Sequence, residues 1–547
     1  MKRIYRTLSF VLCFILIASA LAGCHSDNDR LDFIYPFKGD IASFDPQIAS
    51  TADEFLVIEN CFEGLVRIRD NGEVEPGVAE SWSISEDGLT YTFKLRRGAK
   101  WRIKEKGAVK ELMGDGFNPD ITANDFVFAL KRACDPNTDS PLFSSIAGIV
   151  NAADIHSGNM SSDRLGVTAQ DNYTLTINLQ SADSGFLNTL STAVAMPCNE
   201  EYFNATKGRY GLGLDYTMFN GQFYVSAVLE SSYIIKNNDL YVGDNPSKVT
   251  DITLNIINPE SDIPKNLKNG YYDAAYITGA EYEMLDNDKI TVTPYSNKMW
   301  AVVINKNRQL FSNKDLRQAI CLSISDIDIQ EHPYLAQATG ITPPSCVIGS
   351  STADQMIGTT VPAQNTDKAV ELWRSGLEKE KFTSAALTVI TTKEMEEIAK
   401  HLVQGIQGSI GQISSYGKNS TIAFSLKIEA LDTDEFNKRF SGGDYDLALH
   451  CFEASSHSPV TFLSEIINNN YVGEIPSAKE AVENAQNASA EDLPDACRNA
   501  EEEIINDWSL FPVLYESSYY AQAKGVSGVD FHPGSGRVSF VNAEREK

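Results

Sequence analysis

The stretch from Ser43 to Trp101 decides the fold of this chain. It opens with SFDPQ (Ser43–Gln47), continues with CFEGLVRIRDNGEVEPGVAESW (Cys61–Trp82) and ends with SEDGLTYTFKLRRGAKW (Ser85–Trp101). Five glycines separate its short apolar runs, namely Gly64, Gly72, Gly77, Gly88 and Gly98. Glycine at such intervals is typical of turns between strands. The stretch therefore predicts a β-rich start to a globular lobe.

The last part of this stretch contains a clear strand pattern. After the turn signal Asp87–Gly88, apolar residues alternate with polar ones, and the apolar set is Leu89, Tyr91, Phe93 and Leu95. Successive side chains of a strand point to opposite faces. This period of two therefore predicts a strand with one buried face.

The first residues predict where the chain resides. Three cations (Lys2, Arg3 and Arg6) precede an apolar run of 14 residues, Leu8–Leu21, which is short for a membrane span. The run continues into Leu-Ala-Gly-Cys at Leu21–Cys24, which resembles a bacterial lipobox. We expect a signal peptide at 1–23, acylation of the Cys24 thiol and a polar tether at 24–30, which together anchor the mature chain by lipid outside the cytoplasm. The alternatives are an ordinary signal peptide with a chance cysteine and an uncleaved anchor.

The charge of the chain argues against two classes of partner. Loss of the three signal-peptide cations would take the formal net charge from −28 to −31. Nucleic acid and anionic lipid surfaces both require a basic patch, so neither is expected as a partner. The acidity is typical of a solvated surface, and it would also suit a cationic ligand.

Cysteine usage indicates buried thiols. Outside the signal peptide and Cys24, the chain contains Cys61, Cys134, Cys198, Cys321, Cys346, Cys451 and Cys497. An odd number of widely spaced cysteines is no disulfide framework, and no Cys-x-x-Cys pair indicates structural zinc. We expect most of them to behave as small hydrophobic residues.

Strand-like and helix-like segments alternate along the chain, which predicts mixed α/β lobes. Expected strands lie at 173–179, 251–257, 300–305 and, as a short final strand, 511–515. Expected helices lie at 122–132, with a capping box at Thr122–Asp125, and at 313–323, 366–375, 393–406 and 479–508. The last helical region is expected to break near Leu493–Pro494.

The opening stretch and later motifs resemble the bacterial extracellular solute-binding proteins of family 5, the peptide/nickel type. The later motifs are Asp135–Pro141, Ile146–Ile149, Leu165–Val167, Asn220–Phe223, Gly270–Ala275 and Phe311–Ala319. They are closest to the oligopeptide-binding lipoproteins of ABC importers. Two departures are Gln222, where the family prefers Pro or Ala, and Ser325–Asp328, where it usually has an Asp-Arg pair.

The resemblance implies an α/β two-lobe periplasmic-binding-protein type II fold with an extra small domain in the N-terminal lobe, three domains in a pear shape. Lobe I would comprise 31–58, 186–298 and 508–547, the extra domain II 59–185, and lobe III 299–507. The chain would cross between the lobes near Met299 and return near Trp508, and the lobes would close on the ligand.

No catalytic motif stands out. Gly534–Gly536 is the nearest approach to a nucleophile elbow, but it lacks the spacer residue on each side of the serine. A P-loop, an HExxH motif and a dinucleotide fingerprint are also missing from the sequence. We expect a protein that is not an enzyme and has no cofactor.

The segment from His450 to His457 contains thiol, carboxylate and imidazole groups that could bind a transition metal. In an extended strand, however, His450 and Cys451 point to opposite faces. A polar cleft wall is therefore the favoured interpretation, and metal is the alternative.

The same segment should bind the ligand. By the resemblance, Cys451 to Ser455 lines the cleft and pairs with a peptide as an added strand. Phe452 stands at a family Trp, Ala454 at a family Ala and Ser455 at the Asp that neutralises the peptide's ammonium. A serine cannot balance that charge. Three explanations remain open: Glu453 takes over the role, the ligand lacks a free amino terminus or binds in another frame, or the ligand is not a peptide.

On the opposite lobe, the resemblance implies that Ser50, Thr51 and Ala52 flank the ligand, with Tyr515 near the cleft or equally in the core. We expect a monomeric, lipid-anchored receptor that delivers oligopeptides to the permease subunits of an ABC importer. The alternatives are a receptor for nickel, haem or another non-peptide solute, and a lipoprotein that senses a peptide signal without transport.

Overall fold

The computed structural model describes residues 32–546 apart from 70–72, 104–107, 115, 184, 244–246, 259–260, 286–289, 350, 383, 412–422, 455–457, 469–471, 490 and 533–536. The predicted signal peptide, Cys24 and the tether lie outside the described residues, as do Ser455, His457 and Gly534–Gly536. Within the described part, no helix is long and apolar enough to cross a membrane.

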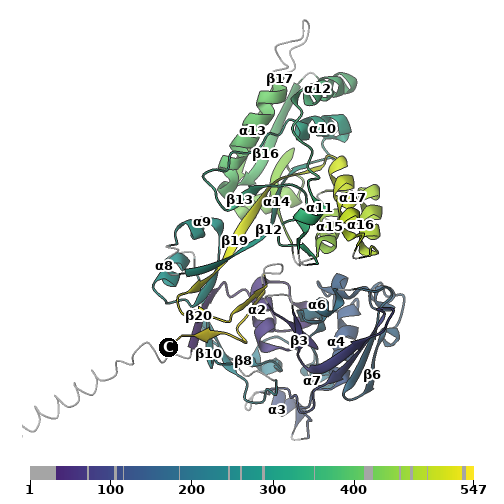
Figure 1. The fold of residues 1–547 in the computed structure, drawn as a ribbon, viewed down its shortest axis with the longest axis vertical. Helices are drawn as coiled ribbons and strands as arrows, with labels where there is room; N and C mark the ends of the chain where they lie inside the picture. The colour runs from purple at the N-terminus through teal and green to yellow at the C-terminus, as the bar shows by residue number, and fades with distance from the viewer. Residues whose placement is uncertain are drawn as a thin grey trace, which may run out of the picture.

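The N-terminal half of the chain forms the lower lobe in Figure 1, around two four-stranded sheets. The first has the order β1 (Asp32–Phe37), β10 (Asp251–Ile256), β9 (Ser232–Asn237) and β8 (Phe223–Val228). The second has the order β4 (Ala79–Ile84), β5 (Thr90–Leu95), β7 (Thr174–Asn178) and β6 (Val167–Asp171). The helices of this half are α2 (Ala52–Cys61), α3 (Ala108–Met113), α4 (Ala123–Cys134), α5 (Ala152–His156), α6 (Phe186–Leu190) and α7 (Glu200–Thr206).

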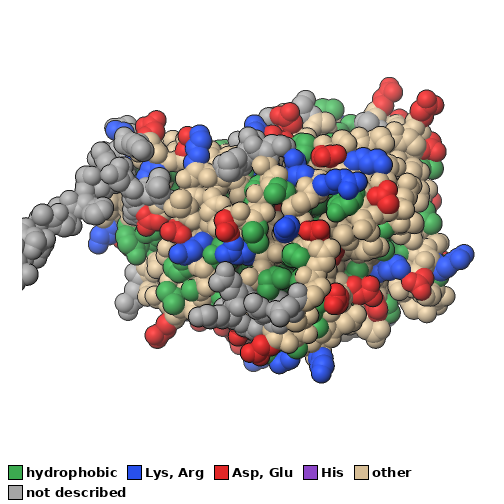
Figure 2. All heavy atoms as spheres, turned by 90° about the horizontal axis from the view of Figure 1, so that it is seen from below, with side chains coloured by type: hydrophobic (Ala, Val, Ile, Leu, Met, Phe, Trp, Pro, Cys, Tyr) green, Lys and Arg blue, Asp and Glu red, His purple; other side chains and the backbone are tan. Residues whose placement is uncertain are grey.

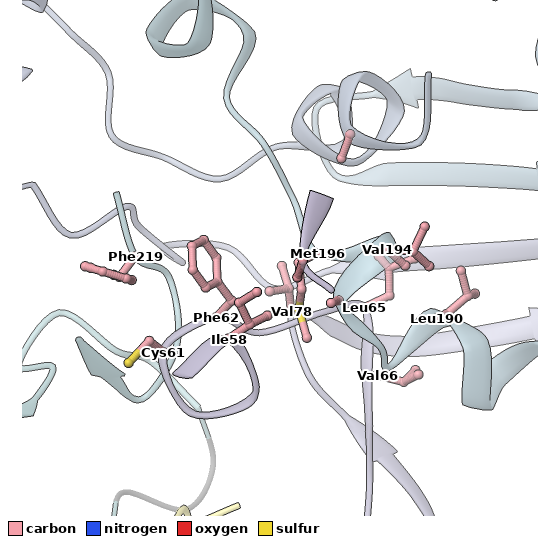
Figure 3. Close-up of a cluster of buried hydrophobic side chains, with 14 of the residues drawn as sticks. Ile58, Cys61, Phe62, Leu65, Val66, Val78, Leu190, Val194, Met196 and Phe219 are labelled. Carbon is pink, nitrogen blue, oxygen red and sulfur yellow. The ribbon is translucent and has the colours of Figure 1, made fainter. Parts of the chain in front are cut away.

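The opening stretch belongs to the core of this lobe. Tyr91, Phe93 and Leu95 are buried on one face of β5, which confirms the predicted alternation. Figure 3 shows apolar side chains of the stretch, such as Phe62 and Val78, packed with Met196 and other residues from later in the chain. The stretch therefore forms part of the structural core of this lobe.

The upper lobe is built on a seven-stranded sheet. Its order is β11 (Ala274–Ile277), β19 (Leu510–Ala523), β12 (Ile290–Ile304), β18 (Leu447–Glu453), β16 (Ser384–Thr392) and β17 (Ala423–Leu431), and β13 (Leu335–Gln337) also pairs with β19. One face packs against α10 (Lys314–Leu322), α12 (Thr366–Glu380) and α13 (Glu396–Ile410). The other packs against α11 (Ala353–Ile357), α14 (Thr433–Ser441), α15 (Pro459–Asn468), α16 (Pro476–Gln486) and α17 (Leu493–Asn506).

Two long antiparallel strands, β12 and β19, run from one lobe to the other (Figure 1). Their lower halves pack in a small cluster with α8 (Ile263–Lys268) and near α9 (Gly279–Glu283), and their upper halves lie between the two cores of the upper lobe. A register shift separates the halves between Tyr295 and Lys298. The fold is therefore the expected two-lobe α/β fold. The predicted domain boundaries stay a prediction, since one hydrophobic cluster joins residues assigned to lobe I and to domain II.

Most predicted elements are present, and two strands were predicted too short. The capping box at Thr122–Asp125 and the break between α16 and α17 are confirmed, with proline in the first turn of α17. The prediction of a short final strand at 511–515 is wrong, because β19 has 14 residues and short strands follow it. The strand predicted at 300–305 is the second half of β12, whose first half mixes exposed and buried residues irregularly.

The surface visible from below the molecule carries charges of both signs. Figure 2 shows Lys and Arg side chains interspersed with Asp and Glu on that face. Such mixing is typical of a solvated surface that keeps a protein soluble.

Candidate ligand-binding site

The strand predicted to bind the ligand, β18, has an open edge. It pairs with β12 from Leu447 to Glu453, but with β16 only at Leu447 and Ala448. Among the described strands, none pairs with β18 on the β16 side beyond Ala448. The later residues of β18 therefore expose one row of main-chain groups.

The groups on that open edge can be assigned from the alternation of the strand. The Ala454 amide donates to the Asn297 carbonyl on the β12 side at 2.8 Å. In an antiparallel pair, alternate residues direct their N–H and C=O to the same neighbour. The amides and carbonyls of Leu449, Cys451 and Glu453 therefore point to the open edge, where an extended chain could add as a strand.

The side chains of this segment divide between core and solvent. Phe452 and Ala454 are 6% and 2% exposed and pack in the cluster with α14 and α15. Cys451 is half-buried against the opposite cluster, and burial raises the pKa of its thiol. Glu453 is exposed. Of the predicted ligand-binding side chains on β18, that of Glu453 is the most open to solvent.

Three charged side chains lie at one level of the sheet, next to the register shift between the lobes. Glu453 of β18 and Glu516 of β19 are both register partners of Lys298 on β12. The Lys298 Nζ lies 3.1 Å from Glu516 Oε1, and the Trp300 indole donates to Glu516 Oε2 at 2.7 Å. Glu453 instead accepts a hydrogen bond from the Asn297 side-chain amide at 2.8 Å.

Charge in this row is therefore distributed unevenly. Burial would lower the pKa of Lys298, but its neighbours, Glu516 foremost and then Tyr276 and Cys451, together outweigh burial, and the pKa is raised. Both oxygens of Glu516 are engaged, whereas the ion pairs of the described residues leave Glu453 without a cation. Nearby, burial raises the pKa of the Tyr276 hydroxyl to about 12. The row can accept one further positive charge at Glu453.

On the opposite lobe, the predicted residues lie at the start of α2. Thr51 is the N-cap, and Ser50 and Ala52 on either side of it are exposed. The Ser50 and Thr51 amides donate to Glu54 Oε2 at 2.8 and 3.1 Å. These two amides are therefore engaged inside the protein, and the Ser50 carbonyl is left as an acceptor.

Tyr515 lies in the core. Its side chain is 4% exposed, and its hydroxyl bonds both the amide and the carbonyl of Gly340 at 3.0 Å. This position favours the core alternative for Tyr515. A contact with ligand stays a prediction.

His450 and Cys451 do not converge on a metal position. The His450 ring stacks on Phe440 with 4.1 Å between ring centres, on the cluster opposite to the one that Cys451 contacts. Burial lowers the pKa of His450 to about 4. Among the described residues, no three His, Cys, Asp or Glu side chains are grouped as metal ligands would be.

Three residues of the site were missed at the level of sequence: Asn297, Lys298 and Glu516. Lys298 and Glu516 are 218 positions apart, and Asn297 and Glu453 are 156 apart. No local pattern connects residues so distant. The polar and apolar residues of 290–299 follow no regular alternation, so the first half of β12 was not predicted as a strand. This irregularity is the one sequence signal that could have indicated an unusual segment here.

The chain has known relatives over nearly its whole length. The family model described as "Bacterial extracellular solute-binding proteins, family 5 Middle" matches residues 73–473. The dipeptide-binding protein DppE of Bacillus subtilis is 25% identical and covers 90% of this chain and 88% of its own. The oligopeptide-binding protein OppA of the same organism is 25% identical and covers 99% of both chains. A solved structure, the substrate-binding domain of an oligopeptide ABC transporter from Bacillus anthracis, has a TM-score of 0.73 at 22% identity and covers 95% of this chain and 99% of that one.

Proposed function

Because this chain belongs to the bacterial extracellular solute-binding proteins of family 5, we propose that it is the oligopeptide receptor of an ABC importer. It captures peptides between its two lobes and delivers them to the permease subunits. Capture and release require no bond to be made or broken, so the proposal assigns it no catalysis. The observation that carries the proposal is the open edge of β18 beyond Ala448.

An open strand edge suits a peptide better than other solutes. Main-chain hydrogen bonds are common to all peptides, so an edge that offers the N–H and C=O groups of Leu449, Cys451 and Glu453 binds extended chains with little regard to sequence. Its side chains Phe452 and Ala454 are occupied in the core and so contribute shape more than selectivity.

We assign the peptide's amino terminus to Glu453. The family's Asp position, Ser455, has no charge. In the row formed by Lys298, Glu453 and Glu516, Glu453 is the carboxylate that no described cation neutralises. An ammonium placed there would complete the row and gain a charge-assisted hydrogen bond. The buried position of His450, away from Cys451, gives no support to a nickel or haem receptor.

The remaining features of the proposal concern location and assembly. They comprise cleavage of a signal peptide at 1–23, lipidation of Cys24, a tether at 24–30 and a monomeric mature chain with lobe I at 31–58, 186–298 and 508–547, domain II at 59–185 and lobe III at 299–507. Lipidation can be checked by labelling with a palmitate analogue, and it should disappear in Cys24→Ala.

The assignment of Glu453 can be tested by one neutral substitution. Glu453→Gln should weaken binding of free-amino peptides by roughly tenfold or more, about 1.4 kcal/mol, while N-acetylated peptides should hardly be affected. The matched control is Glu378→Gln, an exposed carboxylate on α12 at the far end of the upper lobe (Figure 1). Calorimetric titration measures all these affinities. An equal loss for free and acetylated peptides would contradict the assignment.

Native mass spectrometry of the purified protein tests the ligand class itself. A bound molecule that fragments into amino acids is the expected result. A bare metal ion or a tetrapyrrole in its place would overturn the peptide proposal.

A further inference from the structure

Tyr334 packs directly on Gly279, beside the two strands that join the lobes. A Cβ built on Gly279 would lie 2.5 Å from the Tyr334 Cβ and even closer to its ring, and the three nearest heavy atoms from elsewhere in the chain all belong to this one side chain. Gly279 is the first residue of α9, and its φ is not positive. The glycine is therefore required for space and not for a special backbone conformation.

The two partners of this contact are attached to different halves of the hinge strands, β12 and β19. Tyr334 immediately precedes β13, which pairs with β19 as far as Glu516. Gly279 lies shortly after β11, which pairs with β19 from Tyr519 onward. Only Ser517–Ser518 separates the two sets of pairs, at the level of the register shift between the lobes. The contact therefore spans the point at which the hinge strands can bend.

Both partners are held firmly by their own half of the molecule. The helix α9 begins with a capping box, and its Tyr282 ring stacks on Tyr519 of β19 with 4.0 Å between ring centres. The Tyr334 carbonyl accepts the Ser517 amide at 2.8 Å. The Tyr334 ring packs against the hydrophobic cluster beside α10 and α13 as well as against the small cluster around the lower halves of the hinge strands. A change in the distance between Tyr334 and Gly279 therefore requires the two halves to move.

The contact lies on the side of the hinge strands away from the proposed ligand groups. Figure 1 shows α9 and β13 to the left of β12 and β19, whereas α2 of the lower lobe and α15 of the upper lobe lie to the right. Ser50 lies just before α2, and Glu453 ends β18 shortly before α15. Bending that brings these right-hand elements together therefore separates Tyr334 from Gly279, and bending the other way presses them against each other.

We propose that Tyr334 and Gly279 form a stop, which limits how far the lobes open and thereby sets the affinity for peptide from outside the ligand site. The ring rests on the glycine in this arrangement of the lobes, so further opening is blocked, while closing releases the contact. This inference rests on the proposed peptide-binding function and deepens it. Apparent affinity increases with the fraction of the closed form in the protein without peptide, so a change that disfavours opening should tighten binding.

The substitution Gly279→Ala tests the proposal, because it inserts a Cβ into the contact. Rotation of the tyrosine ring leaves the Tyr334 Cβ in place, so the two segments must separate to admit the new atom. A rise of the closed fraction from about 1% to about 10% would make tetra-alanine bind about tenfold more tightly. Calorimetric titration measures the affinity. Small-angle X-ray scattering should show a smaller radius of gyration for the variant without peptide.

The matched control is Gly408→Ala, on α13 of the upper lobe. Gly408 is also a helical glycine, but a Cβ there would meet no heavy atom of the described residues within 4 Å. This variant should leave the affinity and the radius of gyration unchanged.

A second variant, Tyr334→Gly, should act in the opposite direction. It removes the three atoms that a Cβ on Gly279 would meet, so the lobes should open wider and tetra-alanine should bind more weakly. Combined with Gly279→Ala, it should cancel the gain in affinity, because the two changes act on one contact and are not additive.

Two results would overturn the inference. The first is a folded Gly279→Ala variant that binds tetra-alanine no more tightly than the unmodified protein. The second, which also decides the matter if Gly279→Ala does not fold, is a Tyr334→Gly variant with unchanged affinity and radius of gyration. Scattering without peptide tests the stop independently of the ligand. Failure of the unmodified protein to bind tetra-alanine would count against the proposed function and not against the stop.

Discussion

At the scale of single residues, His450 shows how the environment of β18 sets the behaviour of a group that the sequence marks as a possible metal ligand. Its ring packs against Phe440 and Phe452 in the upper lobe, and burial lowers its pKa to about 4. The neutral imidazole is therefore favoured in the folded protein, whereas the unfolded chain takes up a proton near the ordinary value of about 6.5. His450 contributes to the packing and electrostatics of the strand.

This difference predicts a pH dependence of stability. The contribution of His450 to the free energy of unfolding is fully present above a pH of about 6.5. It is lost as the pH falls toward 4, because between these values the imidazole is protonated mainly in the unfolded state. Between pH 7 and pH 5 the loss should be about 2 kcal/mol. Since other groups titrate in both proteins, His450→Phe should lose about 2 kcal/mol less than the unmodified protein over the same interval. Urea unfolding at the two pH values measures this, and equal losses would show that His450 is protonated in the folded state.

At the scale of elements, proline substitutions can test which main-chain N–H groups of β18 face its open edge. Cys451 directs its N–H away from β12, and Phe452 directs its N–H toward it. Proline lacks this N–H and is tolerated in strands where the group faces outward. Cys451→Pro should therefore fold, with a loss of about 1 kcal/mol, yet bind tetra-alanine at least about tenfold more weakly.

The comparison with Phe452→Pro makes the result decisive. That substitution removes a bond to β12 and a buried ring, so it should abolish folding or cost about 4 kcal/mol. Circular dichroism and calorimetry measure both variants. If Cys451→Pro binds peptide normally, the ligand does not pair with this edge.

Elements that depend on local pattern were predictable, and those that depend on distant partners were not. The strand β5 was predictable, because its one buried face produces a regular alternation in the sequence. The helix α12 was predicted only in part: the sequence indicated an end at Ser375, but the helix continues to Glu380. Gly376 allows the extended part of α12 to pack closely against Leu316 of α10, since a Cβ at this position would lie 2.7 Å from the Leu316 side chain. The contacts around Lys298, Glu453 and Glu516, by contrast, join residues that are more than 150 positions apart in the sequence, so only the fold reveals them. The sequence alone suggested that Glu453 binds the amino terminus of a peptide, whereas only the structure shows that Lys298 and Glu516 lie beside it.

At the scale of the whole molecule, the two lobes have separate cores joined by two strands. One hydrophobic cluster occupies the lower lobe, two occupy the faces of the upper sheet, and β12 and β19 connect them (Figure 1). A link of two strands with a register shift at its centre is suited to bending, whereas the packed cores move as units. The proposed ligand contacts, Ser50 and β18, lie on different lobes. A ligand that touches both can therefore favour the closed arrangement only by its greater affinity for it.

This geometry predicts that peptide binding closes and stabilises the molecule together. At a tetra-alanine concentration of about 100 times Kd, the free energy of unfolding should rise by about 2.7 kcal/mol, and the radius of gyration from small-angle X-ray scattering should fall. Glu453→Gln should need a higher peptide concentration to reach the same compact form, because the substitution weakens binding without altering the hinge strands. Stabilisation without compaction would mean that the peptide is bound by one lobe alone, and then the Ser50 and β18 contacts could not belong to one site.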